Sequence, residues 1–121
     1  MDTELIEANP LVEETIGQVA VKRGPIVYCL ESVDLPEGVK PLDIALSVTN
    51  QFRARHDQRL LGGITLLEGS AVVHSNSNWQ GQLYRPLQAR PLQPIKLRLI
   101  PYSVWANRGP SEMSVWLRQS N

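Results

Sequence analysis

Cysteine, histidine and long apolar runs are scarce in this chain of 121 residues, which contains one cysteine and two histidines. A single cysteine excludes an internal disulfide, and Cys29, within the apolar run PIVYCLE, is expected to be a small buried side chain. Two histidines without paired spacing supply too few ligands for zinc, so no metal site is predicted. No apolar run approaches the roughly 18 residues that span a bilayer, and no membrane partner is expected.

The first residues show no export pattern, and the chain has no excess of charge. The first ten, MDTELIEANP, lack the basic and apolar parts of an export signal; the location stays unknown, and a cytoplasmic one is favoured. Twelve basic and 12 acidic residues leave no net charge, so no nucleic-acid partner is predicted. Nine of the acids lie within residues 1–43 and nine of the bases within 44–121, an asymmetry that should cancel where the two parts interleave.

Short strand patterns recur along the chain, and helical periodicity is almost absent. The clearest pattern is PIKLRLIP, residues 94–101, in which Ile95, Leu97 and Leu99 alternate with basic residues. Similar patterns occupy residues 17–22, 26–31, 43–49, 51–56, 62–73 and 112–118. With about eight or nine short strands separated by turn residues, the sequence predicts an all-β fold. We expect residues 1–121 to form one antiparallel β-sandwich domain of jelly-roll type.

Candidate residues for hydrolysis are sparse. Glycoside hydrolysis commonly needs two carboxylates about 5–9.5 Å apart, yet after Glu68 only Glu112 remains. Glu112 is expected to pair with Arg108 or to cap a loop. His56, adjacent to Asp57, is the better of the two histidines for a serine-type triad, but its setting, RARHDQR, is that of a polar strand end. No catalytic residue is predicted.

Two of the three tryptophans flank a tight turn late in the chain. In IPYSVWANRGPSEMSVWL, residues 100–117, Trp105 and Trp116 stand on either side of Asn107-Arg108-Gly109-Pro110. Strand alternation points Trp116 outward if Val115 points inward, and at least one indole is expected on the surface. Because large exposed aromatic side chains usually mark binding surfaces, the predicted Trp105–Trp116 hairpin is the leading candidate for an interface.

A second candidate is a sugar-binding surface. The stretch SNSNWQGQLYRP, residues 75–86, combines Trp79 and Tyr84 with amide and hydroxyl side chains. Such rings can stack on the C–H face of a sugar while the polar groups hold its hydroxyls. The alternative prediction is therefore a carbohydrate-binding module that uses Trp79, Tyr84 or Trp105. The simpler interpretation of Trp79 is that it closes a loop over the edge of the sandwich.

Four stretches carry a resemblance to a known family. They are, in order, GQVAVKRGPIVYCLE (17–31), RLLGGITLLEGSA (59–71), LYRP (83–86) and IPYSVWANRGPSEMSVWLR (100–118). Together they resemble the C-terminal part of bacterial β-L-arabinofuranosidases of glycoside hydrolase family 127. The resemblance extends from about Asn9 to Arg118, and the last stretch is long and distinctive.

The resemblance implies that the chain is the C-terminal β-sandwich of a longer enzyme. In that family an (α/α) barrel precedes β-sandwich domains and carries a zinc-bound cysteine nucleophile and glutamates; none of those motifs occurs here. We therefore expect a non-catalytic accessory domain, without a cofactor of its own, that stabilises or orients the barrel. Trp105, Asn107, Arg108 and Trp116 would meet the barrel, a neighbouring sandwich or, in a homodimer, a second copy.

Overall fold

The computed structural model describes residues 2–120 except residues 48, 75–80, 88–91 and 109–110. Nine β-strands and five short 3-10 segments make up the regular structure of these residues. The strands are β1 (Thr3–Ile6), β2 (Gln18–Arg23), β3 (Ile26–Glu31), β4 (Ile44–Leu46), β5 (Arg53–Asp57), β6 (Ile64–Val73), β7 (Gln93–Pro101), β8 (Met113–Ser114) and β9 (Leu117–Gln119). The 3-10 segments are η1 (Glu13–Thr15), η2 (Ser32–Asp34), η3 (Pro41–Asp43), η4 (Leu60–Gly62) and η5 (Tyr102–Val104). The predicted all-β class is confirmed.

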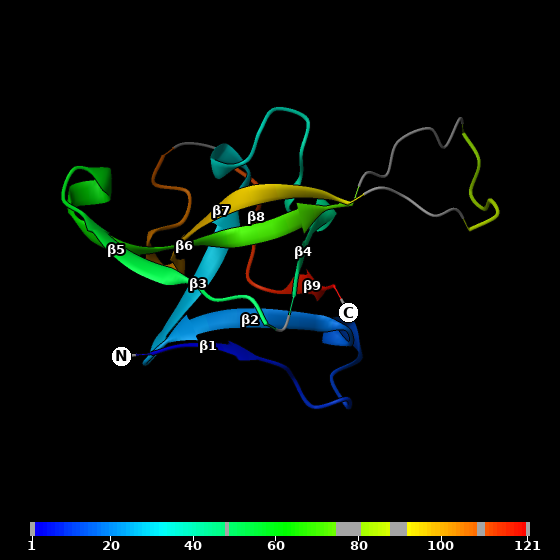
Figure 1. The fold of residues 1–121 in the computed structure, drawn as a ribbon, viewed down its shortest axis with the longest axis horizontal. Coiled ribbons are helices and arrows are strands. Elements are labelled where there is room, and N and C mark those ends of the chain that lie inside the picture. Colours follow the sequence, from blue (N-terminus) through cyan, green and yellow to red (C-terminus); the bar gives the residue numbers. More distant parts are fainter. Residues whose placement is uncertain (1, 48, 75–80, 88–91, 109–110, 121) are drawn as a thin grey trace.

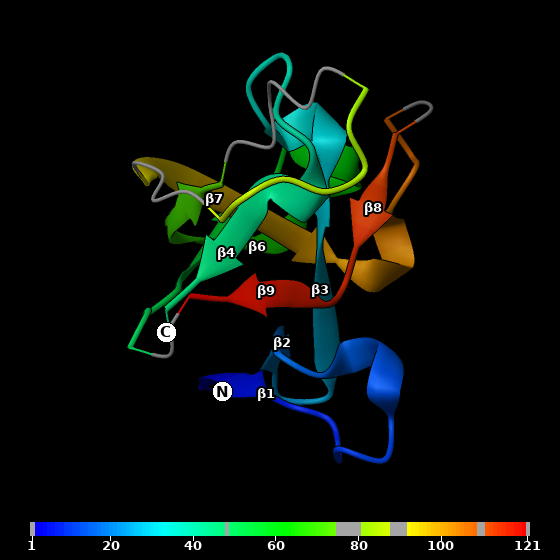
Figure 2. The same ribbon diagram turned by 90° about the vertical axis from the view of Figure 1, so that its right-hand side faces the viewer.

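The strands pair around a ring. β2 pairs with β9, β9 with β4, β4 with β6, β6 with β7, β7 with β3, and β3 with β2 again. In Figure 1, β1 and β2 form the lower layer, β5, β6 and β7 form the upper layer, and β3 runs from one to the other. Figure 2 shows β9 between β4 and β2. The pairing of β4 with β9 is parallel, so the expected antiparallel sandwich is mostly, though not entirely, antiparallel.

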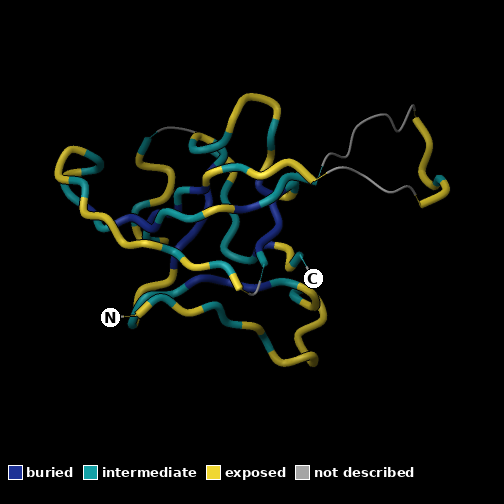
Figure 3. Tube along the Cα trace, viewed as in Figure 1, coloured by how far each residue is buried: buried dark blue, intermediate teal, exposed yellow. Residues whose placement is uncertain are grey.

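The main core lies inside the ring. All six strands of the ring contribute buried apolar side chains to it, which Figure 3 shows as dark blue segments in the middle of the molecule. Alternation in β7 follows the sequence pattern, because Leu97 and Leu99 are buried in this core and Lys96 is exposed. In β3, Tyr28 and Leu30 face the same core, and the Tyr28 hydroxyl donates to the carbonyl of Thr65 at 2.7 Å.

A second, smaller core lies on the outer face of β3, β6 and β7. Cys29, Ile64 and Ile100 are buried there. The residues that cover them come from two loops and the late strands, namely Leu60, Leu61, Val104, Met113 and Val115. The cover explains why Ile100 and Cys29, which alternation places outside the main core, are buried as well. The expected burial of Cys29 is confirmed.

The predicted Trp105–Trp116 hairpin is wrong as a strand pairing. β3 lies between β7 and β8 in the sheet, with Cys29 opposite Ile100 and Leu30 opposite Ser114. The segment after β7 therefore crosses β3 before it pairs, and the final strand is broken into β8 and β9 at Val115 and Trp116. The turn residues had suggested a local hairpin, whereas β3, distant in sequence, takes the position between the two strands.

A leucine at the centre of the main core should dominate stability. Leu30→Ala removes a completely buried side chain from the centre of β3, and such truncations cost about 2–5 kcal/mol in the free energy of unfolding. Leu87→Ala is the matched control because Leu87 is 98% exposed. Urea denaturation of the 121-residue chain should show a large loss for the first variant and almost none for the second. Equal losses would contradict the assignment of the core.

Candidate functional site

Two acidic residues on the outer face of β3 hold the segment that contains Trp105. Glu31 ends β3 and is completely buried, and Asp34 ends η2. The Arg108 guanidinium donates to both Asp34 oxygens, at 2.8 and 2.7 Å, and to Glu31 Oε1 at 3.3 Å. Bidentate pairs of this kind are the strongest charge-assisted hydrogen bonds in proteins. We call Glu31, Asp34, Ala106 and Arg108 the acidic clamp.

Ala106 connects the acidic clamp to Trp105. Its backbone N–H donates to Glu31 Oε2 at 3.1 Å, and its φ is +67°, in the left-handed region that side chains other than glycine rarely adopt. The buried carboxylate thus stabilises a strained backbone position directly after Trp105. The indole follows η5 and is 39% exposed. The expectation of at least one surface indole is confirmed for Trp105.

The clamp is electrostatically balanced. The hydrogen bonds that Arg108 donates to Asp34, together with the charges of Asp34 and Glu31, raise the pKa of Arg108 and keep its guanidinium charged. A second arginine, Arg98 on β7, lies 3.9 Å from Asp34. Two carboxylates therefore face two guanidinium groups. A buried carboxylate whose oxygens already accept hydrogen bonds from arginine is poorly placed to contact a sugar and donate a proton to it.

Cys29 lies on the same face, beneath the clamp. Burial, and secondarily the charge of Glu31, raise the pKa of its thiol to about 12. A nucleophilic cysteine needs a lowered pKa and access to its substrate, so Cys29 has the opposite properties. Among the described residues no group of three His, Cys, Asp or Glu side chains is placed to hold a metal ion. The zinc that the family resemblance implies has no matching donor set in this part of the chain.

Of the two roles expected for Glu112, an ion pair with Arg108 or the capping of a loop, the ion pair with Arg108 is wrong. Arg108 pairs with Asp34 and Glu31, whereas Glu112 is held through its backbone: its N–H donates to Ser32 Oγ at 3.0 Å and its carbonyl accepts from the Ser32 N–H at 2.8 Å. The interface role proposed for Arg108 changes with this finding. Its guanidinium is directed into its own chain, so Arg108 positions the surface instead of offering that group to a neighbour.

The other predicted interface residues lie in different settings. Asn107 is exposed next to the clamp, and Trp116 is half-buried between β8 and β9, where its carbonyl accepts from Ser114 Oγ at 2.6 Å. The outward orientation predicted for Trp116 relied on a continuous last strand, which the structure breaks at this point. Gly109 and Pro110 of the predicted turn lie outside the described residues.

The candidate sugar-stacking residues are not gathered on one surface. Tyr84, between β6 and β7, is 89% exposed. In Figure 1 the described residues 81–87 lie at the far right, whereas the orange segment that leads from β7 to β8 and contains Trp105 lies on the left. The two rings cannot stack on the same short sugar. Trp79, the third candidate, lies outside the described residues.

His56 and Asp57 form no catalytic pair. They are consecutive in β5, so their side chains point to opposite faces of the strand. Asp57 accepts from the backbone N–H groups of Arg59 at 2.9 Å and Leu60 at 3.2 Å, which lowers its pKa. Its role is to order the turn before η4.

Among the described residues, the structure contains no helix with the length and apolar character required to cross a membrane.

Sequence reasoning missed Glu31 and Asp34. Glu31 ends the strand pattern of residues 26–31, and the sequence predicts no partner for it or for Asp34. The available signal was the placement of a glutamate at the end of an otherwise apolar strand, because a buried carboxylate requires a cation. Nothing local indicates that this cation is Arg108, more than 70 residues later in the chain.

Comparison with known proteins decides the family. The model of the glycoside hydrolase family 127 C-terminal domain matches residues 3–118. The chain belongs to this family. It is 39% identical, over 98% of its length, to the non-reducing end β-L-arabinofuranosidase of Bifidobacterium longum subsp. longum, of which it covers 18%.

Solved structures agree with this assignment. A GH127 β-L-arabinofuranosidase from Geobacillus stearothermophilus T6 superposes with a TM-score of 0.87 at 39% identity, over 99% of this chain and 18% of the other. A protein described as a glycoside hydrolase gives a TM-score of 0.88 at 41% identity, over 100% of this chain and 20% of the other. The chain thus spans about a fifth of the length of the relatives it matches.

Breaking the clamp should cost more than breaking an exposed ion pair. Arg108→Ala leaves Glu31 and Asp34 buried without their principal cation, which typically costs about 3–5 kcal/mol in the free energy of unfolding. Arg55→Ala is the matched control, because Arg55 pairs with Glu68 at 2.8 Å on the surface. Denaturant unfolding should show a large loss for Arg108→Ala and no measurable change for Arg55→Ala. Similar stabilities would contradict a stabilising role for the clamp.

The Cys29 thiol should resist modification in the folded chain. Because its pKa is raised from 9.0 to about 12, the folded state retains the thiol proton at pH 8–9, where an unfolded cysteine already forms thiolate. Iodoacetamide at pH 8.5 should therefore alkylate the chain slowly, and one equivalent should react rapidly in guanidinium chloride. Stability should also fall as the pH rises from 9 towards 12. Equal alkylation rates in both states would contradict the burial of Cys29.

Proposed function

We propose that this chain is a non-catalytic accessory domain that packs against the remaining part of a GH127 β-L-arabinofuranosidase and stabilises or orients its catalytic barrel. Docking uses Trp105 and Asn107, held in place by Arg108, with Trp116 beside the end of the same segment. The catalytic groups and the zinc that the family resemblance implies belong to that remaining part. The neighbouring β-sandwich and a second copy of the chain are further partners for the same surface.

The exposed indole of Trp105 is the observation that carries this proposal. A tryptophan buries about 150–250 Å² when fully covered, and 39% of Trp105 remains exposed. Covering that part would contribute about 2 kcal/mol at 25 cal/mol per Å². The acidic clamp fixes the backbone beside the ring, so docking needs little further ordering of this segment.

The chemistry of the described acids supports a non-catalytic role. The buried carboxylates of Glu31 and Asp34 both form ion pairs with Arg108. Glu68 pairs with Arg55 on the surface. The share of the relatives that this chain covers, 18%, supports the same assignment, because most of an arabinofuranosidase lies outside the matched region. The proposal thus assigns catalysis to the larger part of the enzyme and docking to this domain.

Removing the indole should weaken docking. The test combines the catalytic part of the enzyme, produced without this domain, with the 121-residue chain, and measures their association by calorimetry. Trp105→Ala should reduce the affinity about 30-fold, which corresponds to about 2 kcal/mol. Tyr84→Ala is the control, because Tyr84 lies at the opposite end of the molecule. A loss caused by Tyr84→Ala and not by Trp105→Ala would overturn the assigned surface.

The same proteins test the alternative of a carbohydrate-binding module, which the exposed ring of Tyr84 favours. Arabino-oligosaccharides are titrated into the isolated chain while its aromatic fluorescence is recorded. Docking without sugar stacking predicts no saturable change. A saturable change that Tyr84→Ala or Trp105→Ala abolishes would support the module instead.

A further inference from the structure

A break in the pairing along β6 creates a pocket. β4 and β5 both pair with β6 on the edge opposite β7: Ala45 lies opposite Val72, and Arg53 lies opposite Glu68. Residues 46–47 and 49–52 consequently stand against only residues 69–71 and bulge out of the sheet. The Asn50 side-chain amide donates to the carbonyl of Ser70 and replaces a ladder hydrogen bond that the bulge removes.

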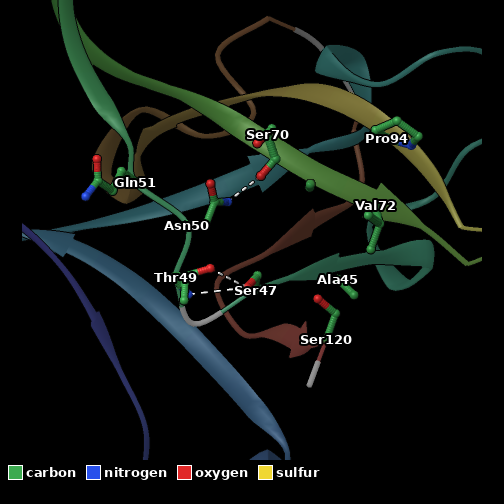
Figure 4. A pocket seen from close by; sticks show the side chains of 10 residues that line it. Ala45, Ser47, Thr49, Asn50, Gln51, Ser70, Val72, Pro94 and Ser120 are labelled. Atoms are coloured by element: carbon green, nitrogen blue, oxygen red, sulfur yellow. Dashed lines mark hydrogen bonds between the residues drawn. The ribbon is translucent and has the colours of Figure 1, made fainter.

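The pocket at this bulge, shown in Figure 4, has a volume of about 460 Å³, within the range of small-molecule sites. Its apolar lining consists of Ala45, Ala71, Val72 and Pro94. Its polar lining consists of Ser47, Thr49, Asn50, Gln51, Ser70 and Ser120. In Figure 4, Asn50, Thr49 and Ser47 stand opposite Val72 and Ala45, and the Gln51 side chain points away from them.

Internal hydrogen bonds order the bulge, and several polar groups of the pocket remain able to form hydrogen bonds with a ligand. The Ser47 and Thr49 hydroxyls bond to each other at 2.9 Å, and the Thr49 N–H donates to Ser47 Oγ at 3.3 Å. Ser120 is fixed by its N–H, which donates to the Leu46 carbonyl at 2.7 Å. Within the described part of the chain, no hydrogen bond engages Asn50 Oδ1 or the hydroxyls of Ser70 and Ser120. These groups can bond to a ligand without disturbing the loop.

The described residues that line the pocket carry no charge, and this determines the ligand class. A phosphate, carboxylate or ammonium ligand would enter without a counter-charge and would lose its hydration. Hydroxyl and amide groups that both donate and accept, facing a small apolar wall, match a molecule with many neutral hydroxyls and a C–H face. We propose that this pocket is a binding site for a small neutral sugar. The site is separate from the docking surface and does not depend on docking.

Nuclear magnetic resonance of the uniformly ¹⁵N-labelled 121-residue chain tests the site. L-Arabinose, up to about 50 mM and therefore well above a millimolar dissociation constant, should shift the amide signals of Asn50, Ser70 and Ala71 saturably. D-Galacturonate, a sugar of similar size with a carboxylate, should not. Tryptophan fluorescence should stay constant in both titrations, because none of the described residues that line the pocket is a tryptophan.

Variants locate the binding. Ser120→Ala removes one free hydroxyl and should weaken the arabinose complex about five-fold, the effect of one hydrogen bond. Ser70→Val fills the pocket from β6 and should abolish the shifts. Ser103→Ala, an exposed serine in η5, is the matched control and should change nothing. The proposal is overturned by an absence of saturable shifts, by equal shifts with galacturonate, or by shifts that both pocket variants leave unchanged in a folded chain.

Discussion

The ion pairs of Arg108 with Asp34 and Glu31 determine the arrangement of the late part of the chain. After β7 the backbone crosses the outside of β3, and the clamp fastens it there. The same crossing places Val104, Met113 and Val115 over Cys29 and Ile100 and so completes the second core. It also sets the backbone at Ala106 and with it the exposure of Trp105. Without this cation the two buried acids would repel one another in a poorly hydrated site.

The clamp joins the acid-rich and the base-rich parts of the sequence. Asp34 and Glu31 belong to the acid-rich first third, and Arg108 and Arg98 belong to the base-rich remainder. The fold brings these parts together across β3 and β7, so the opposite charges meet in space. Partners so distant in sequence impose a loop-closure cost on folding, which a shielded and bidentate pair can offset more effectively than a surface pair.

Local patterns in the sequence were sufficient for the class of fold and for the faces of individual strands. The alternation in residues 94–101 correctly placed Leu97 and Leu99 in the core. Strand neighbours could not be obtained in this way. The insertion of β3 between β7 and β8 depends on contacts between distant segments, and it overturned the predicted hairpin.

The candidate sites also combine features that local sequence predicts with features that depend on contacts between distant segments. Strand alternation predicted at least one indole on the surface, and Trp105 is such a residue. The partners of Arg108 and the pocket beside Asn50 both arise from pairing registers, which a single sequence does not specify. The family resemblance supplied the identity that neither composition nor periodicity contains.

The position of β9 has a consequence for biosynthesis. This late strand lies between β2 and β4, not at an edge, and Leu117 fills part of the main core. During translation the edges of β2 and β4 that pair with β9 stay unpaired until residues 117–119 have left the ribosome. The ring of strands therefore becomes complete only after β9 has been synthesised. A chain that stalls before β9 exposes unpaired strand edges, which chaperones can bind or which can aggregate.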